Sequence, residues 1–83
     1  MKIRKYDLGS ANLVGKNIEK IRKEQGIKQK DFIARLQACG LDINPTSYSK
    51  LEGQVRMASD KEVYFIARVL GVKMEALFDI DKQ

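Results

Sequence analysis

The 83-residue chain contains no histidine and no tryptophan, and it has one cysteine and one proline. Without histidine, it lacks the commonest general acid–base catalyst and a principal zinc ligand. The single cysteine, Cys39, excludes an internal disulfide and a multi-cysteine metal site. The sequence also offers no carboxylate pair that we can assign to a pocket. We therefore expect no enzyme, no metal site and no cofactor, and we interpret Cys39 as a small, half-buried filler rather than a redox sensor.

Long apolar runs are absent as well. The longest, Val69-Leu70 with Val72, is far too short to cross a bilayer. The basic start of the chain, residues 1–5, is not followed by the apolar core of a signal peptide. We therefore predict a cytoplasmic protein that has no contact with a membrane.

The charge is biased toward basic residues, with 16 lysines and arginines against 11 acidic residues and a net charge of +5. This excess favours a polyanionic partner without identifying it, because many small domains carry a similar charge. The hydrophobic fraction of 43% is normal for a folded protein. At this length the chain is sufficient for one small domain with a single core.

Apolar residues recur at helical spacing in several segments. Helices are predicted over residues 13–25, 29–38, 45–53, 60–70 and 74–78. The residues expected to face the core are Val14, Ile18, Ile21, Phe32, Ile33, Leu36, Tyr48, Leu51, Val63, Ile66, Ala67, Leu70, Met74, Leu77 and Phe78. The connections are short and no strand pattern is visible. The predicted fold is all-α, a compact five-helix domain over residues 13–78. A basic arm or frayed segment (1–12) precedes it, and a short tail (79–83) follows.

The segment at 45–53 has an unusual outer face. Asn44 is a preferred N-cap, Pro45 suits the first helical position, and Gly53 is a natural stop. Tyr48 and Leu51 mark a narrow buried edge. The other side chains are short and uncharged or basic, namely Thr46, Ser47, Ser49 and Lys50. Such a face contributes little to a core and is suited to lie against another molecule.

Several stretches occur in the order and near the spacing of a known family. They are VGKNIEKIR (14–22), GIKQ (26–29), SKLEG (49–53) and IARVLGV (66–72). On these motifs, the chain from Val14 to Phe78 resembles the Cro/lambda-repressor family, also called the XRE-type helix-turn-helix family. The turn from Cys39 to Asn44 is longer than the usual one and resembles a variant subgroup. The resemblance implies a lambda-repressor-like DNA-binding domain that acts as a homodimer and inserts helix 45–53 into the major groove.

The resemblance also implies which residues meet DNA. The candidate DNA-binding residues are Gln29, Pro45, Thr46, Ser47, Ser49, Lys50, Gln54 and Arg56. Gln29 matches the glutamine that meets the backbone at the start of the second helix, and Gln54 and Arg56 fall in the next loop toward phosphates. For Gln29, Lys50 and Arg56, the alternative is an ordinary polar surface residue. Lys50 alone carries the donor for a guanine contact of about 1–3 kcal/mol, so specificity is expected to rest partly on DNA shape.

Glu52 is acidic and is interpreted as structural, paired with Arg35 or Arg22.

The leading hypothesis for the function is a sequence-specific DNA-binding transcriptional regulator, a repressor that acts by occupying double-stranded DNA. The alternative is an antitoxin-like or anti-regulator module that binds a protein partner through the last helix and the tail.

Overall fold

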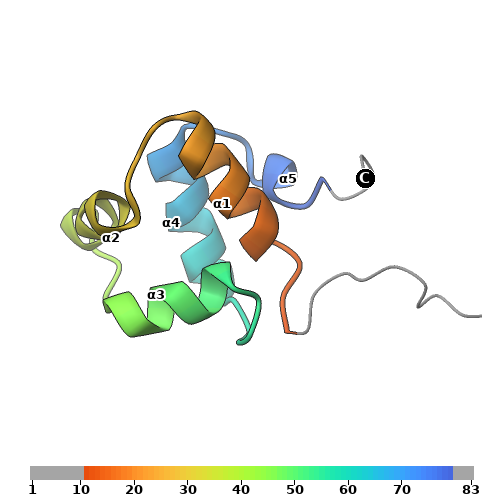
Figure 1. Cartoon of the computed structure of the whole chain (residues 1–83), viewed down its shortest axis with the longest axis horizontal. Coiled ribbons are helices and arrows are strands. Elements are labelled where there is room, and N and C mark those ends of the chain that lie inside the picture. Colours follow the sequence, from red (N-terminus) through yellow and green to blue (C-terminus); the bar gives the residue numbers. More distant parts are fainter. Residues whose placement is uncertain (1–10, 80–83) are drawn as a thin grey trace, which may run out of the picture.

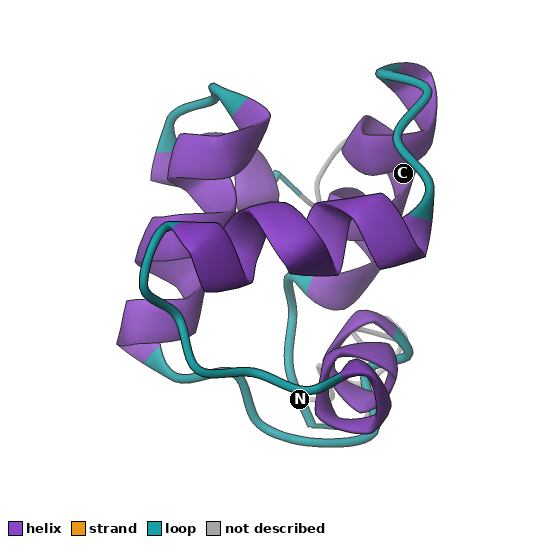
Figure 2. Ribbon diagram, turned by 90° about the vertical axis from the view of Figure 1, so that its left-hand side faces the viewer, coloured by secondary structure: helices purple, strands orange, loops and turns teal. Residues whose placement is uncertain are grey.

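The computed structural model describes residues 11–79, and these form five helices joined by short connections. The helices are α1 (Gly15–Glu24), α2 (Gln29–Ala38), α3 (Pro45–Glu52), α4 (Asp60–Leu70) and α5 (Met74–Leu77) (Figure 1). Figure 2 shows only helices and loops in this part of the chain. The predicted all-α, five-helix fold is confirmed, and the predicted bounds differ from the observed ones by at most two residues.

The helix ends follow the capping residues of the sequence. Ser59 and Glu62 form the reciprocal capping box that starts α4, and Gly71 ends this helix in the left-handed conformation at φ 72°. At α3, the Asn44 side chain accepts a hydrogen bond of 2.8 Å from the amide of Ser47. Lys28 precedes α2 without a side-chain cap, as the sequence predicted.

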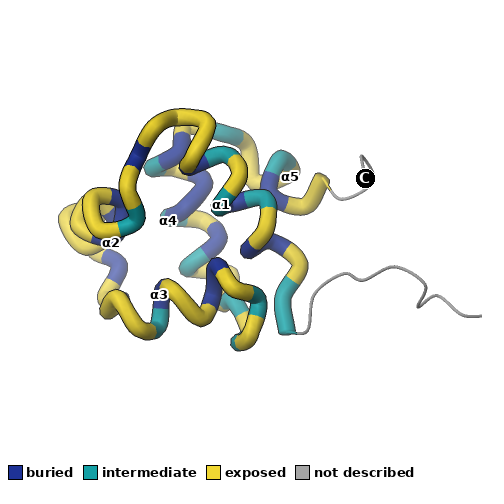
Figure 3. The backbone as a smooth tube through the Cα atoms, in the orientation of Figure 1, coloured by how far each residue is buried: buried dark blue, intermediate teal, exposed yellow. Residues whose placement is uncertain are grey.

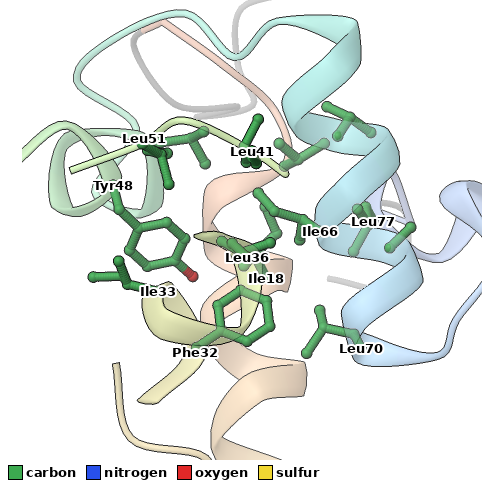
Figure 4. Packing of buried hydrophobic residues seen from close by; sticks show 14 of the residues in the cluster. Ile18, Phe32, Ile33, Leu36, Leu41, Tyr48, Leu51, Ile66, Leu70 and Leu77 are labelled. Atoms are coloured by element: carbon green, nitrogen blue, oxygen red, sulfur yellow. The ribbon is translucent and has the colours of Figure 1, made fainter. Parts of the chain in front are cut away.

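The core lies where α1, α2, α3 and α4 meet, and Leu77 of α5 closes it on one side (Figure 4). The Tyr48 ring of α3 packs edge-on against Phe32 of α2, with ring centroids 5.7 Å apart. Leu41 and Ile43 of the connection between these helices are also buried. This connection is thus ordered by its own apolar residues, which fixes how α3 follows α2.

The structure corrects several core assignments. Met74 and Phe78 are 41% and 45% exposed, so Leu77 alone anchors α5 in the core. Ile21 faces the core as predicted, but it is only partly buried against it. Cys39 is exposed, which contradicts its interpretation as a half-buried filler. Met74, Phe78 and Cys39 lie at or beside the ends of helices, where an apolar residue at helical spacing has no facing partner to cover it.

Gly15 permits the close crossing of α1 and α3. A Cβ atom at this position would lie 2.5 Å from the backbone oxygen of Leu51 and 2.6 Å from that of Glu52. These distances are well below van der Waals contact, so any larger residue would push the two helices apart. The start of α1 therefore sets the position of the end of α3.

The segment before α1 is joined to the same end of α3. The Asn12 side chain donates hydrogen bonds of 2.9 Å to the carbonyl oxygens of Leu51 and Arg56, and it accepts one of 2.8 Å from the amide of Gly15. The amide of Ala11 donates to the carbonyl of Gln54 at 3.1 Å. The predicted arm or frayed segment at 1–12 is therefore ordered at its last two residues, and its first ten lie outside the described residues.

Candidate functional site

The two faces of α3 differ sharply in burial and in chemistry. Tyr48, Leu51 and Glu52 are buried on the inner face. The outer face carries the exposed residues Pro45, Thr46, Ser49 and Lys50, with Ser47 half-buried at its edge. In Figure 3, α3 lies along one border of the molecule with exposed residues over much of its length. The structure thus brings five of the predicted DNA-binding residues together on one helix.

The inner face is fixed by a buried carboxylate. Glu52 accepts two hydrogen bonds from the Arg22 guanidinium, from Nε at 2.8 Å and from Nη2 at 3.0 Å. Arg22 also donates to the carbonyl of Ile27 at 2.8 Å. Both charged residues are only 6% exposed, so this pair links α1 to the C-terminal end of α3 away from water. The prediction that Glu52 is structural is confirmed, with Arg22 as its partner.

Tyr48 and Gln29 also donate hydrogen bonds to this carboxylate. The Tyr48 hydroxyl donates to Oε2 of Glu52 at 2.7 Å, and Nε2 of Gln29 donates to Oε1 at 2.9 Å. Burial acts to raise the pKa of Glu52, but the hydrogen bonds from Arg22, Tyr48 and Gln29 outweigh it and lower that pKa below its usual value. Burial and the hydrogen bond to Glu52 raise the pKa of Tyr48, so its hydroxyl stays protonated. At neutral pH the network therefore holds Glu52 ionised beneath α3, with its charge balanced by Arg22.

Gln29 extends this network to the surface. Its side-chain oxygen accepts a hydrogen bond of 3.1 Å from the exposed hydroxyl of Ser49. Gln29 is half-buried at the first position of α2, where the amides of the first turn have no capping side chain. Free amides at a helix start suit an anion, and the exposed Lys28 and Lys30 flank this turn, although Asp31 is exposed there as well. Sequence reasoning did not assign these two lysines to the site, yet their position beside Gln29 in the sequence was a usable signal.

Arg56 and Gln54 turn toward the protein in this structure. Nε of Arg56 donates to the carbonyl of Ser47 at 3.0 Å, and its two terminal nitrogens hold the Glu62 carboxylate at 3.0 and 2.8 Å. Nη1 also donates to the carbonyl of Met57 at 2.6 Å. Gln54, at φ 64°, donates from Nε2 to the carbonyl of Asn12 at 3.1 Å. Arg56 thus ties α3 to the start of α4, and a phosphate contact by either residue stays a prediction.

The described part of the chain contains neither a metal-binding cluster nor a membrane-spanning helix. Over residues 11–79, no group of three or more cysteine or acidic residues is arranged to hold a metal ion. Within the same range, every helix is too short or too polar to span a membrane.

Comparison with known proteins adds one finding. A protein-family model described as helix-turn-helix matches residues 18–77, which include most of α1 and all of α2–α5. Searches of curated proteins and of solved structures gave no significant match. The matched region contains the outer face of α3, the Glu52 network and the start of α2.

Proposed function

Because the chain belongs to the XRE-type (Cro/C1-type) helix-turn-helix family of DNA-binding regulators, we propose that it recognises a specific sequence with α3 in the major groove. The observation that best supports this proposal is the contrast between the two faces of α3. Its inner face is held by Tyr48, Leu51 and the Glu52 network, while its outer face presents short polar side chains and a lysine. A helix that is rigid beneath and polar above is suited to enter a groove without losing order.

The outer residues then divide by chemistry. Lys50 donates to the major-groove edge of guanine, and Thr46 and Ser49 form hydrogen bonds with other bases. Pro45 is exposed on this face and meets base edges without a donor to offer, and Ser47 is half-buried at the edge of the face. Gln29 and the first amides of α2, with Lys28 and Lys30, contact a phosphate and set the orientation of the domain. Gln54 and Arg56 approach a second phosphate through the loop after α3.

The proposed biological role is repression by occupancy. A homodimer bound to a palindromic site blocks access of polymerase to a promoter. Two half-sites read by a symmetric dimer would lie about one helical turn, roughly 34–36 Å, apart. The net charge of +5 supports attraction to DNA and a marked decrease of affinity with salt.

The test is a titration of labelled DNA, selected from a random pool, over a range of salt concentrations. We expect the affinity to fall steeply with salt, and Lys50→Ala and Thr46→Ala to weaken binding to the selected site. Lys20→Ala serves as the matched control, because Lys20 is exposed on α1 and lines a groove with Ala76 of α5, on another side of the molecule. Binding that does not depend on salt, or that all three variants change equally, would contradict the proposal.

A second candidate function is suggested by α5. Met74 and Phe78 at its two ends are exposed, and apolar surface of this kind is suited to a protein partner. An antitoxin-like or anti-regulator module would bind its partner there. Light scattering after size exclusion separates the candidates: a monomer that binds no DNA but co-purifies with another protein would favour the second. The two functions can coexist in one molecule.

A further inference from the structure

We propose that Ser49 is a specificity-determining residue that reads the exocyclic amino group of adenine or cytosine, because its own hydroxyl proton is committed to Gln29. The inference rests on the proposed function and deepens it. It assigns to one exposed side chain the direction of its hydrogen bond to DNA. A free serine hydroxyl has no such direction, since it both donates and accepts.

The direction follows from the Glu52 charge. An ionised carboxylate accepts hydrogen bonds and donates none, so the Gln29 atom that lies 2.9 Å from Oε1 of Glu52 has to be the NH₂ group. The amide oxygen of Gln29 then points the other way, toward Ser49. An amide oxygen is also only an acceptor, so the contact of 3.1 Å between Ser49 Oγ and Gln29 Oε1 requires the serine proton. Each bond in the relay is therefore fixed by the one before it.

The relay starts from a group that cannot easily reverse it. Arg22 donates twice to Glu52 and Tyr48 donates once, so the carboxylate is held ionised and in one orientation. Burial keeps water away from Arg22 and Glu52, which are both 6% exposed. Flipping the Gln29 amide would place its oxygen against the carboxylate and its NH₂ group toward Ser49, at the loss of a charge-assisted hydrogen bond. The orientation seen in the structure is the one that satisfies every partner.

Ser49 is left with lone pairs directed outward. It is exposed on the same face of α3 as Lys50. In the major groove, the hydrogen-bond donors on base edges are the N6 amino group of adenine and the N4 amino group of cytosine. Guanine O6 and thymine O4 are acceptors and cannot pair with a hydroxyl whose proton is used elsewhere. Polarisation along the chain of hydrogen bonds strengthens Oγ as an acceptor. Lys50 thus requires a hydrogen-bond acceptor on one base, and Ser49 requires a donor on a neighbouring base.

The first test compares the base preferences of three proteins. The full chain, Ser49→Ala and Gln29→Met are each used to select sequences from a random DNA pool. We expect one position of the wild-type site to prefer adenine or cytosine over guanine or thymine, and Ser49→Ala to lose this preference at that position alone. Gln29→Met frees the serine proton, so the preference there should broaden to all four bases. A lower overall affinity of Gln29→Met does not enter the comparison, since preference is a ratio between sequences.

The second test removes the amino group from the DNA and leaves the protein unchanged. Adenine is replaced by purine, or cytosine by 2-pyrimidinone, at the Ser49-dependent position. We expect wild-type affinity to fall about fivefold, the size of one neutral hydrogen bond, and Ser49→Ala to bind both duplexes equally. This test does not use Gln29→Met, so it remains decisive if that variant folds poorly.

The outcomes separate the inference from the proposed function. If no sequence is selected, the proposed function itself is overturned. If a sequence is selected but its Ser49-dependent position is guanine or thymine, or if Gln29→Met keeps the same preference, the inference fails and the proposed function stands. An unchanged affinity of the wild type for the amino-deleted duplex also overturns the inference.

Discussion

Replacement of Glu52 by alanine removes the centre of the buried network and should be the most damaging single change in α3. The carboxylate accepts four hydrogen bonds, two from Arg22 and one each from Tyr48 and Gln29, at 2.7 to 3.0 Å. Its loss leaves the Arg22 guanidinium buried with an unpaired charge and the Tyr48 hydroxyl without an acceptor. Removing one partner of such a pair typically costs about 3–5 kcal/mol.

This cost is large beside the whole stability of a small domain. At about 0.05–0.15 kcal/mol per residue, a chain of this length unfolds with a free energy of roughly 4–12 kcal/mol. Glu52→Ala should therefore remove at least a quarter of the stability and leave a partly unfolded protein if the wild type lies at the lower end. The assay is urea denaturation followed by circular dichroism, with the midpoint and slope compared with those of the wild type.

Glu19→Ala is the matched control, because Glu19 pairs with Lys23 at 3.1 Å on the surface, where the two side chains are 43% and 64% exposed. Its expected cost is about 0.5 kcal/mol or less. A double-mutant cycle with Arg22→Met should show strong coupling in the free energy of unfolding, because the buried Arg22 charge destabilises the fold only when Glu52 is absent. A cost below about 1 kcal/mol for Glu52→Ala, or no coupling to Arg22, would refute the reasoning.

Three further predictions concern the supports of α3 and α4. Gly15→Ala should lower stability by about 1–3 kcal/mol through the clash with the carbonyl oxygens of Leu51 and Glu52, whereas Lys20→Ala on the same helix should have little effect; calorimetric melting temperatures that rank the two otherwise would contradict this. Ser59→Ala should cost about 1 kcal/mol by removing the capping box of α4, and equal urea midpoints for this variant and the wild type would exclude the cap as a stabilising feature. Burial acts to raise the pKa of Glu62, but hydrogen bonds from Arg56 and the Ser59 amide lower it overall, and the pKa of Glu52 is lowered as well. The lowered pKa values of both residues stabilise the fold above the unfolded pKa of about 4.3, and this stability is lost as the pH falls through the lower folded pKa values. At a pH below about 4, the urea midpoint of the wild type should therefore decrease, and that of Glu62→Gln should decrease less. A wild-type midpoint that stays constant in this acidic range would show that these pKa shifts are absent.

The helices and most of the core were accessible from the sequence because local signals and burial agree in them. Ser59 and Glu62 predict a capping box, and Tyr48 and Leu51 predict the inner edge of α3; the structure contains both features. The predictions of burial are wrong where an apolar residue at helical spacing has no other helix packed against it. Met74 and Phe78 have helical spacing, but α5 spans only Met74–Leu77 and turns Leu77 alone into the core.

The candidate site was predicted as a set of residues but not as a geometry. Exposure of Thr46, Ser49 and Lys50 follows from their place opposite Tyr48 and Leu51 on one helix. The hydrogen bonds of Gln29 to Glu52 and Ser49 join residues 23 and 20 positions apart, respectively, and no local pattern encodes such a contact. The same holds for Arg56, whose guanidinium is held by Glu62 and the carbonyl of Ser47. Long-range polar contacts of this kind depend on how the helices cross.

The surface of the protein that meets DNA can be located most directly by nuclear magnetic resonance. Isotopically labelled protein is titrated with the selected duplex, and changes in the backbone amide signals are followed residue by residue. We expect the largest changes over residues 45–50 and at the start of α2 around Gln29, with little change at Met74, Leu77 and Phe78. Changes concentrated in α5, with α3 unaffected, would contradict the claim that the outer face of α3 is the DNA-reading surface.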